Sequence, residues 1–145
     1  MGASGASTQL IFFVSAVIVA SAVVAAAANS VYGITSGIDQ KSDNIQKEML
    51  TDISIINDPT NVPNDPVKIY VKNLGNTVLN QNYITVMLDG MVVTDYTLSL
   101  SGNTSSHWDP SSVISITIDQ TLTSGDHTVT VTTENGIMDR LSFRI

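Results

Sequence analysis

The sequence predicts an N-terminal transmembrane α-helix followed by an all-β, immunoglobulin-like antiparallel sandwich. Three observations support this fold class. The segment from Leu10 to Ala28 contains no charged residue, the apolar residues after it keep a helical spacing, and from Thr51 onward apolar and polar residues alternate. We therefore divide the chain into a long helix over residues 1–50 and a β-sandwich domain over residues 51–145.

The apolar segment over residues 10–28 matches the hydrocarbon core of a bilayer in length. Nineteen helical residues rise about 28 Å, close to the roughly 30 Å thickness of that core. Ten of the side chains are large and apolar, and together they contribute roughly −3 to −6 kcal/mol toward insertion. The predicted membrane-spanning residues are Leu10, Ile11, Phe12, Phe13, Val14, Val17, Ile18, Val19, Val23 and Val24.

A cleaved secretory signal is the alternative interpretation of this segment, because Ala26–Ala28 offers a signal-peptidase site. A signal peptide begins with a positively charged region, whereas the nine residues before the segment contain no Lys or Arg. The apolar core is also longer than that of most signals. We therefore expect an uncleaved anchor, whose orientation the charges do not define.

A helical apolar stripe continues past the predicted span. Its members lie three, four or seven residues apart, and the charged residues fall on other faces, so we expect the helix to reach about Leu50 with one narrow face that needs a partner. The helix-packing stripe is Val31, Ile34, Ile38, Ile45 and Met49. Gly33 and Gly37 form a small-xxx-small pair that would permit close approach of another helix, and they would equally suit a bend.

Seven segments after the helix read as short strands bounded by turn-forming residues. They are residues 52–58, 67–73, 83–89, 96–100, 113–118, 127–133 and 140–145. This number of short strands predicts a two-sheet sandwich, and the absence of cysteine excludes the antibody-type disulfide. Trp108 lies in a polar stretch, so we do not expect it in the core.

Two turns predict the pairing of neighbouring strands. Asp89-Gly90 suits a two-residue type I′ turn. At the second turn, a three-residue loop over residues 134–136 keeps apolar residues opposite one another, whereas a two-residue Asn-Gly turn would set valines against Arg140 and Ser142. The expected pairs are Leu88–Met91 and Val86–Val93 around the first turn, and Val129–Leu141 and His127–Phe143 around the second.

Composition and motifs argue against nucleic-acid binding and catalysis. The net charge is −7 and the basic residues form no run, which excludes phosphate-backbone binding. His107 and His127 have no ligand-type neighbour at helical or hairpin spacing, and no Gly-rich phosphate loop follows a strand. Asn57-Asp58-Pro59 offers oxygens to calcium, but turn formation is the ordinary role of Asx-Pro. We expect no catalytic residue, no metal ligand and no cofactor.

Asn103-Thr104-Ser105 is an N-glycosylation sequon between two predicted strands. Asn103 is therefore a candidate glycosylation site. Such a modification agrees with an extracytoplasmic sandwich.

The order of apolar helix, amphipathic continuation and β-sandwich resembles that of archaeal type IV pilin-like proteins. The stretches "TDISIINDPTNVP" (51–63), "VKIYVKNLGNTVLN" (67–80) and "VMLDG" (86–90) are similar to the archaellum accessory protein family FlaG, also called ArlG. The FlaF (ArlF) family, with the same architecture, is the nearest relative. The most particular part of the likeness is the family-like motif Ile55, Ile56, Asn57, Asp58 and Pro59.

The resemblance implies a non-enzymatic structural subunit of the archaellum motor. It would be a single-pass, stator-like tether embedded in membrane lipid, with its sandwich in the space between membrane and surface layer. There it would self-associate, assemble with a FlaF-type protein and connect indirectly to the surface-layer protein. The alternative is a filament-forming pilin-like or archaellin subunit. Class III signals place a basic residue before the cleavage site and an acidic one shortly after, and no charge precedes Asp39, so we expect an unprocessed N-terminus.

Overall fold

The computed structural model describes residues 3–100 and 106–145. These residues divide into two compact units at the Asp43–Asn44 boundary, and the second unit holds the last turns of the helix together with all strands. The glycosylation candidate Asn103 lies outside the described residues.

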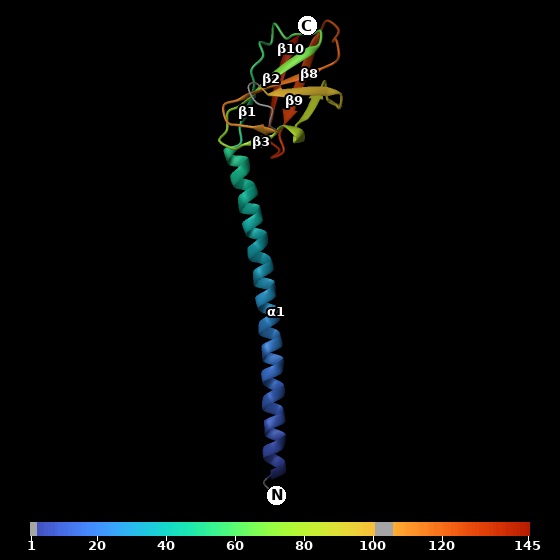
Figure 1. The fold of residues 1–145 in the computed structure, drawn as a ribbon. Helices are drawn as coiled ribbons and strands as arrows, with labels where there is room; N and C mark the ends of the chain where they lie inside the picture. The colour runs from blue at the N-terminus through green and yellow to red at the C-terminus, as the bar shows by residue number, and fades with distance from the viewer. Residues whose placement is uncertain (1–2, 101–105) are drawn as a thin grey trace. The chain divides into compact units, whose positions relative to one another are not determined.

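The helix α1 runs from Ala3 to Leu50 (Figure 1). It contains no proline, and its first half is rich in alanine, the residue with the highest helix propensity. Thr51 ends the helix: its N–H donates to the Glu48 carbonyl at 3.2 Å and its hydroxyl donates to the Lys47 carbonyl at 2.6 Å. These bonds satisfy carbonyl groups that the helix terminus leaves without a helical partner.

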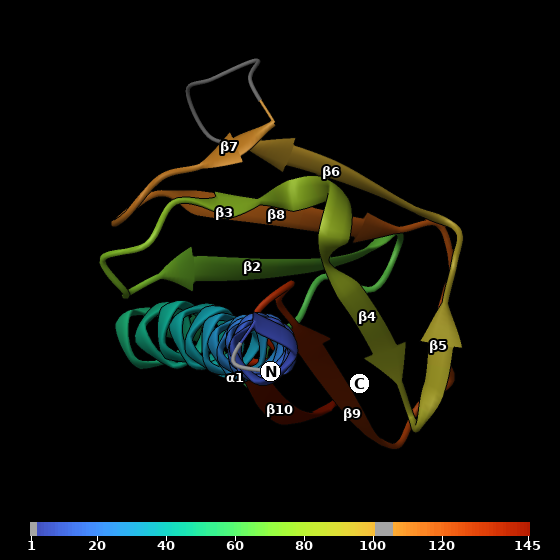
Figure 2. The ribbon, with the colours of Figure 1, turned by 90° about the horizontal axis from the view of Figure 1, so that it is seen from below.

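The strands form two four-stranded antiparallel sheets and one two-stranded ribbon (Figure 2). The first sheet has the order β1-β2-β8-β6, the second has the order β10-β9-β4-β5, and the ribbon pairs β3 with β7. A short 3₁₀ helix, η1 (Gln81–Tyr83), precedes β4. The strands are β1 (Ile53–Ile55), β2 (Val67–Asn73), β3 (Leu79–Asn80), β4 (Thr85–Leu88), β5 (Met91–Val93), β6 (Tyr96–Leu100), β7 (His107–Trp108), β8 (Val113–Ile118), β9 (Asp126–Thr132) and β10 (Met138–Arg144).

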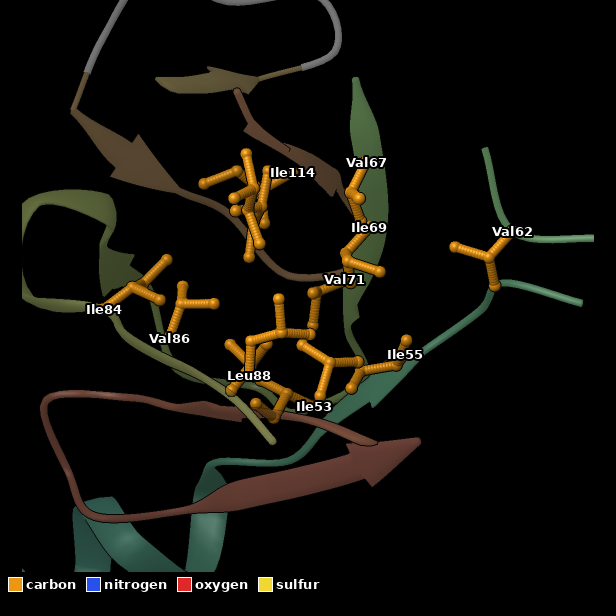
Figure 3. Packing of buried hydrophobic residues seen from close by; sticks show 14 of the residues in the cluster. Ile53, Ile55, Val62, Val67, Ile69, Val71, Ile84, Val86, Leu88 and Ile114 are labelled. Carbon is orange, nitrogen blue, oxygen red and sulfur yellow. The ribbon is translucent and has the colours of Figure 1, made fainter. Parts of the chain in front are cut away.

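The core of the sandwich follows from the period-two pattern. Val67, Ile69 and Val71 on β2 are fully buried, while Lys68 between the first two is partly exposed and Tyr70 between the last two is exposed. Figure 3 shows these side chains directed toward Val86 and Leu88 of the second sheet. Because alternate residues of a strand point to opposite faces, each sheet buries one face between the layers. The predicted fold class, one apolar helix followed by an immunoglobulin-like sandwich, is confirmed.

Both predicted registers are confirmed. Leu88 pairs with Met91 and Val86 with Val93 around Asp89 and Gly90, which have positive φ angles of 51° and 82° as a type I′ turn requires. Around the second turn the pairs are Val129–Leu141 and His127–Phe143. Gly136, at φ 78°, takes the left-handed conformation in the three-residue loop.

The expectation that Trp108 lies outside the core is wrong. Its side chain is fully buried, while its neighbour His107 is exposed. The polar residues after it form a turn, in which the Ser112 N–H donates to the Asp109 carbonyl at 3.2 Å, and the indole N–H donates to the carbonyl of Ser112 at 3.2 Å. Trp108 pairs with Leu79 across the β3–β7 ribbon. The ribbon therefore closes the core, and the indole has a polar partner there.

The first strand is shorter than predicted, because β1 ends at Ile55 instead of residue 58. The Ile56 N–H still donates to the Tyr70 carbonyl at 2.9 Å. From Asn57 onward, the Asn57 side chain replaces the backbone pairing. Its amide donates to the Lys68 carbonyl at 2.8 Å and its carbonyl oxygen accepts from the Tyr70 N–H at 2.7 Å. An Asx side chain can occupy backbone hydrogen-bonding sites in this way, and the chain then turns at Asp58.

Candidate functional site

The ten residues predicted to span the membrane all lie on α1. Their large apolar side chains are exposed, with exposed fractions from 48% at Val14 to 71% at Phe12. The helix is the one segment of the described residues that is long and apolar enough to cross a membrane. No part of its most apolar window is buried within the protein. Lipid is the environment that this surface suits.

Several hydroxyl groups on α1 are hydrogen-bonded to carbonyl groups of the helix itself. Ser21 donates to the Val17 carbonyl at 2.7 Å, Ser30 to the Ala26 carbonyl at 3.1 Å and Thr35 to the Val31 carbonyl at 3.0 Å. An unsatisfied hydroxyl group in hydrocarbon costs on the order of several kcal/mol. A hydrogen bond to the carbonyl group four residues earlier in the helix removes this cost. The polar side chains therefore do not argue against insertion.

The helix-packing stripe predicted from the sequence is exposed throughout. The exposed fractions are 61% for Val31, 64% for Ile34, 63% for Ile38, 45% for Ile45 and 81% for Met49. Gly33 and Gly37 are also open, since a Cβ added at either would meet no atom within 4 Å. Their roles in helix packing stay predictions.

A close junction joins the end of α1 to the sandwich within the second unit. A Cβ at Gly75 would lie 2.5 Å from the Leu50 carbonyl oxygen and 2.6 Å from the Asp52 nitrogen, so only glycine fits there. Two backbone N–H groups of this loop, those of Leu74 and Gly75, donate to the Asp52 carbonyl at 2.8 and 2.9 Å, and the Asn76 N–H donates to the Leu50 carbonyl at 2.8 Å. Within the second unit, these bonds attach the last residue of the helix directly to the sandwich.

Two asparagines organise this junction, and neither was identified from the sequence. Asn73 is fully buried; its side chain donates to the Thr77 and Trp108 carbonyls and accepts from the Gly75 N–H at 3.0 Å. Asn135, in the β9–β10 turn, donates to the Thr51 hydroxyl at 2.8 Å. The Asn73–Trp108 and Asn135–Thr51 contacts join residues 35 and 84 positions apart, so a local sequence pattern does not indicate them.

The family-like motif closes one side of the sandwich. Beyond the Asn57 bonds, the Ile55 N–H donates to the Asp139 carboxylate on β10 at 2.8 Å, and the Pro59 carbonyl accepts from the Arg144 N–H at 3.1 Å. Ile55 is buried and Ile56 is half exposed. The motif thus connects the edges of both sheets, which limits edge-to-edge pairing there.

Asp58, the fourth residue of the motif, caps its own turn. One oxygen of its carboxylate, Oδ1, accepts from the Thr60 N–H at 2.9 Å and from the Thr60 hydroxyl at 2.8 Å. These two bonds favour the charged form, and the pKa of Asp58 is lowered from its ordinary value. Within the described ranges, no three His, Asp or Glu side chains converge as a metal site would require.

A histidine–carboxylate contact is a second feature that sequence spacing did not indicate. His127 Nδ1 lies 2.7 Å from the Asp89 carboxylate, and its Nε2 lies 2.9 Å from the Thr123 carbonyl. The same carboxylate accepts from the Thr128 N–H at 2.8 Å. The Asp89 hydrogen bond is the main cause that raises the pKa of His127, and the His127 hydrogen bond is the main cause that lowers the pKa of Asp89. The contact holds the Asp89-Gly90 turn against the start of β9.

The outer face of the second sheet carries a row of uncharged side chains that ends at an arginine. Cross-strand pairing places Val92 beside Met87, Met87 beside Thr130, and Thr130 beside Arg140. Met138 follows along β10 and is 62% exposed. We call these five residues the Met–Thr face. A depression of about 620 Å³ lies over it.

Comparison with known proteins assigns the chain to a family. The family model described as archaeal-type flagellin matches residues 2–143. The chain belongs to the archaeal-type flagellin family. Among its curated relatives is the putative flagella-related protein G of Methanococcus voltae, 32% identical over 140 residues, which are 93% of both chains. The protein of the same name from Methanocaldococcus jannaschii is 29% identical over 93% of this chain and 92% of its own.

Two solved structures from one archaeon are similar to this chain. The archaellum periplasmic stator protein FlaG from Sulfolobus acidocaldarius is 24% identical, with a TM-score of 0.50 over 65% of this chain and all of that chain. The FlaF–FlaG stator complex from the same organism is 22% identical, with a TM-score of 0.45 over 65% of this chain and 90% of that chain. The FlaG structure confirms the sandwich.

The comparisons confirm the sequence-based recognition of the FlaG family. They support a structural archaellum subunit, and the relatives are named as flagellar or archaellum components rather than as enzymes. The apolar helix and this family membership fit a membrane-anchored archaellum component.

Proposed function

We propose that the protein is a stator-like tether of the archaellum motor. The helix remains uncut and crosses the membrane once over residues 10–28. The sandwich projects to the outer side, where it assembles with a FlaF-type protein and connects to the surface layer. The observation that carries this proposal is the match to flagella-related protein G over 93% of both chains.

The junction supports a tether on mechanical grounds. A subunit that resists the torque of a rotating filament must transmit force from its anchor to its outer domain. The bonds of Leu50 and Asp52 with the loop around Gly75 leave no flexible segment at this point. A Gly/Ser-rich linker would instead let the sandwich rotate and would lose the force.

The Met–Thr face is the surface that we assign to the FlaF-type partner. Three of its members, Met87, Val92 and Met138, are apolar, and Arg140 is its single charged residue. Methionine and threonine side chains on a sheet face suit a contact that excludes water, although the Asp89 carboxylate and Arg140 also line the depression over it. By contrast, the sandwich as a whole carries ten acidic and four basic residues.

Partner binding tests this assignment. The full chain in detergent is mixed with the FlaF-type protein of the same cell and analysed by size-exclusion chromatography. Co-elution is expected for the wild type and for Leu74→Glu, a control at a 53% exposed residue outside the face. Met138→Glu should elute alone, because a carboxylate in a desolvated contact costs several kcal/mol. Absence of a complex with the wild type contradicts the proposed partner, and equal binding by Met138→Glu contradicts the assigned surface.

A filament subunit is the second candidate, because the matching family model is that of archaeal-type flagellin. Filament subunits lose a short leader before assembly, whereas a tether keeps its N-terminus. Mass spectrometry of the native protein separates the two. Retention of Met1 or Gly2 supports the tether, and a new N-terminus among residues 3–9 supports the filament subunit.

A further inference from the structure

One face of α1 repeats every seven residues along almost its whole length. One series on this face contains a large aliphatic residue at every position, and the second series, offset by four, consists mainly of small or hydroxyl-bearing residues. The first series is Leu10, Val17, Val24, Val31, Ile38 and Ile45, and the second is Val14, Ser21, Ala28, Thr35, Ser42 and Met49. The alternating spacing of four and three is the d and a pattern of a heptad repeat. We call these twelve residues the seam.

The seam is exposed and uncharged along its length. All twelve members are exposed in the single chain. All five charged residues of the helix lie within the last twelve residues of α1, and none of them belongs to the seam. They are Asp39, Lys41, Asp43, Lys47 and Glu48. Past the predicted span this apolar face would meet water. In that part lipid is not available to cover it, so a protein surface is required.

The surface of the seam suits a second helix. The hydroxyls of Ser21 and Thr35 are turned onto their own backbone carbonyls, so they present methylene or methyl groups outward. An open groove of about 480 Å³ follows the seam within the predicted span, and Val17, Ser21, Val24 and Ala28 all line it. Small residues alternating with larger ones permit the close packing by which membrane helices associate.

We propose that the seam packs against the same seam of a second copy of this chain, in a parallel, left-handed coiled coil that begins in the membrane and continues past it. The inference deepens the proposed function, since it uses the uncut membrane helix of that proposal. A strict 3.5-residue repeat produces a left-handed supercoil, whereas a single helix in lipid needs no such repeat.

Three observations favour a second copy as the occupant. Identical chains inserted in the same direction are parallel, so each seam residue meets its counterpart in the other copy. The positions flanking the seam then bring Lys41 of one copy beside Gln46 of the other, and Ile34 beside Asp39, without like charges facing one another. Finally, the seam spans roughly 60 Å and is about 10 Å wide, so each copy covers about 600 Å², near the lower limit for a specific interface.

The seam differs from the small-residue pair noted in the sequence. Gly33 and Gly37 occupy positions outside the d and a series, on another face of the helix. They are therefore not part of the proposed contact. Ile34, from the helix-packing stripe, flanks the seam instead of belonging to it.

Single-cysteine cross-linking tests the seam, because the natural chain has no cysteine. The full-length variants Val24→Cys and Ile38→Cys place a thiol on the seam. Val19→Cys is the matched control for Val24→Cys, and Gln40→Cys is the matched control for Ile38→Cys. Each control lies within five residues of its seam position but on the opposite face of the helix. Each variant is expressed in native membranes and treated with a short bismaleimide. The seam variants should give roughly fivefold more cross-linked dimer than their controls, because d positions of parallel copies face one another.

A second substitution distinguishes cross-linking that results from seam packing from cross-linking that results from chance collisions in the membrane. Ile38→Asp in the Val24→Cys background should reduce the dimer to the control level, whereas Gln40→Asp should leave it unchanged. Equal cross-linking at seam and control positions overturns the proposal, as does a dimer that Ile38→Asp does not reduce. If this happens while the chain stays in the membrane and binds its FlaF-type partner, the proposed function stands and only the seam is wrong.

Discussion

The helix and the sandwich differ in how far their apolar side chains are buried and in where their polar groups find hydrogen-bond partners. In the sandwich, the large apolar residues of β2, β8 and β9 are buried, and a polar residue such as Asn73 finds all its partners within the fold. In α1, hydroxyl groups such as that of Ser21 are bonded within the helix, but every large apolar side chain is exposed. The sandwich therefore buries a core within the single chain, whereas the helix leaves its apolar surface uncovered.

Because of this difference, substitutions in the two regions should affect different properties of the protein. Substitutions in the sandwich core should change the free energy of unfolding, whereas substitutions on α1 should change membrane insertion and association. The junction around Gly75 belongs to the first class, because its contacts are backbone contacts within the sandwich unit. Three substitutions test the distinction in order of expected effect.

The largest effect is expected from Trp108→Ala. The side chain is fully buried, so its removal should lower the free energy of unfolding of the sandwich by about 3–5 kcal/mol. Phe12→Ala removes an aromatic side chain that is 71% exposed on α1, and it should leave the sandwich transition unchanged. Scanning calorimetry of the full chain in detergent measures both. A comparable loss in the two variants would show that the regions do not differ as described.

A smaller loss is expected from Gly75→Ala. The added methyl would overlap backbone atoms of Leu50 and Asp52, which have little freedom to move, and overpacking of this kind costs about 1–3 kcal/mol. Gly37→Ala is the matched control, since its methyl meets open space and alanine favours the helix by about 1 kcal/mol. The same calorimetry should show a lower transition temperature for Gly75→Ala alone. An unchanged transition would mean that the junction is loose.

The smallest effect concerns pH. The pKa of His127 is raised, so its contribution to stability is fully present below its unfolded pKa of about 6.5 and is lost as pH rises through the higher folded value. The pKa of Asp89 is lowered, so its contribution is present above about pH 3.9 and is lost as pH falls through the lower folded value. The contact should stabilise the sandwich most between these limits.

The melting temperature, measured from pH 4 to 8, checks this expectation. The wild type should lose stability above about pH 6.5 relative to His127→Gln, in which the residue no longer titrates. His107→Gln serves as the control for loss of the other histidine. Parallel pH profiles for the wild type and His127→Gln would contradict a role for the contact.

Local patterns predicted much of the fold. Period-two alternation located seven of the ten strands of the described residues but not the short strands β3, β5 and β7. The side-chain pattern alone selected the register around residues 134–136, because one residue of slip would have exposed Val129 and Leu141. The helix was predicted from its chargeless apolar segment and from the helical spacing of the apolar residues after it. These features depend on residues close together in the sequence.

Features that depend on distant residues were missed. Trp108 stands among polar neighbours, and only the approach of β3 places it in the core. The bond between Asn135 and Thr51 spans 84 residues, and the contact of His127 with Asp89 spans 38. Such contacts follow from the pairing and packing of segments that lie far apart in the chain, which a local pattern does not contain. The five residues of the family-like motif were identified by resemblance, but their role in joining the sheet edges came from the structure.

The central claim is that the uncut helix anchors a self-sufficient sandwich to the membrane. Extraction of native membranes with alkaline carbonate, followed by mass spectrometry of the intact protein, tests it most directly. The account predicts that the protein remains in the membrane pellet and retains residues 1–28, with an N-terminus at Met1 or Gly2. A soluble protein that begins after Ala28 would contradict it.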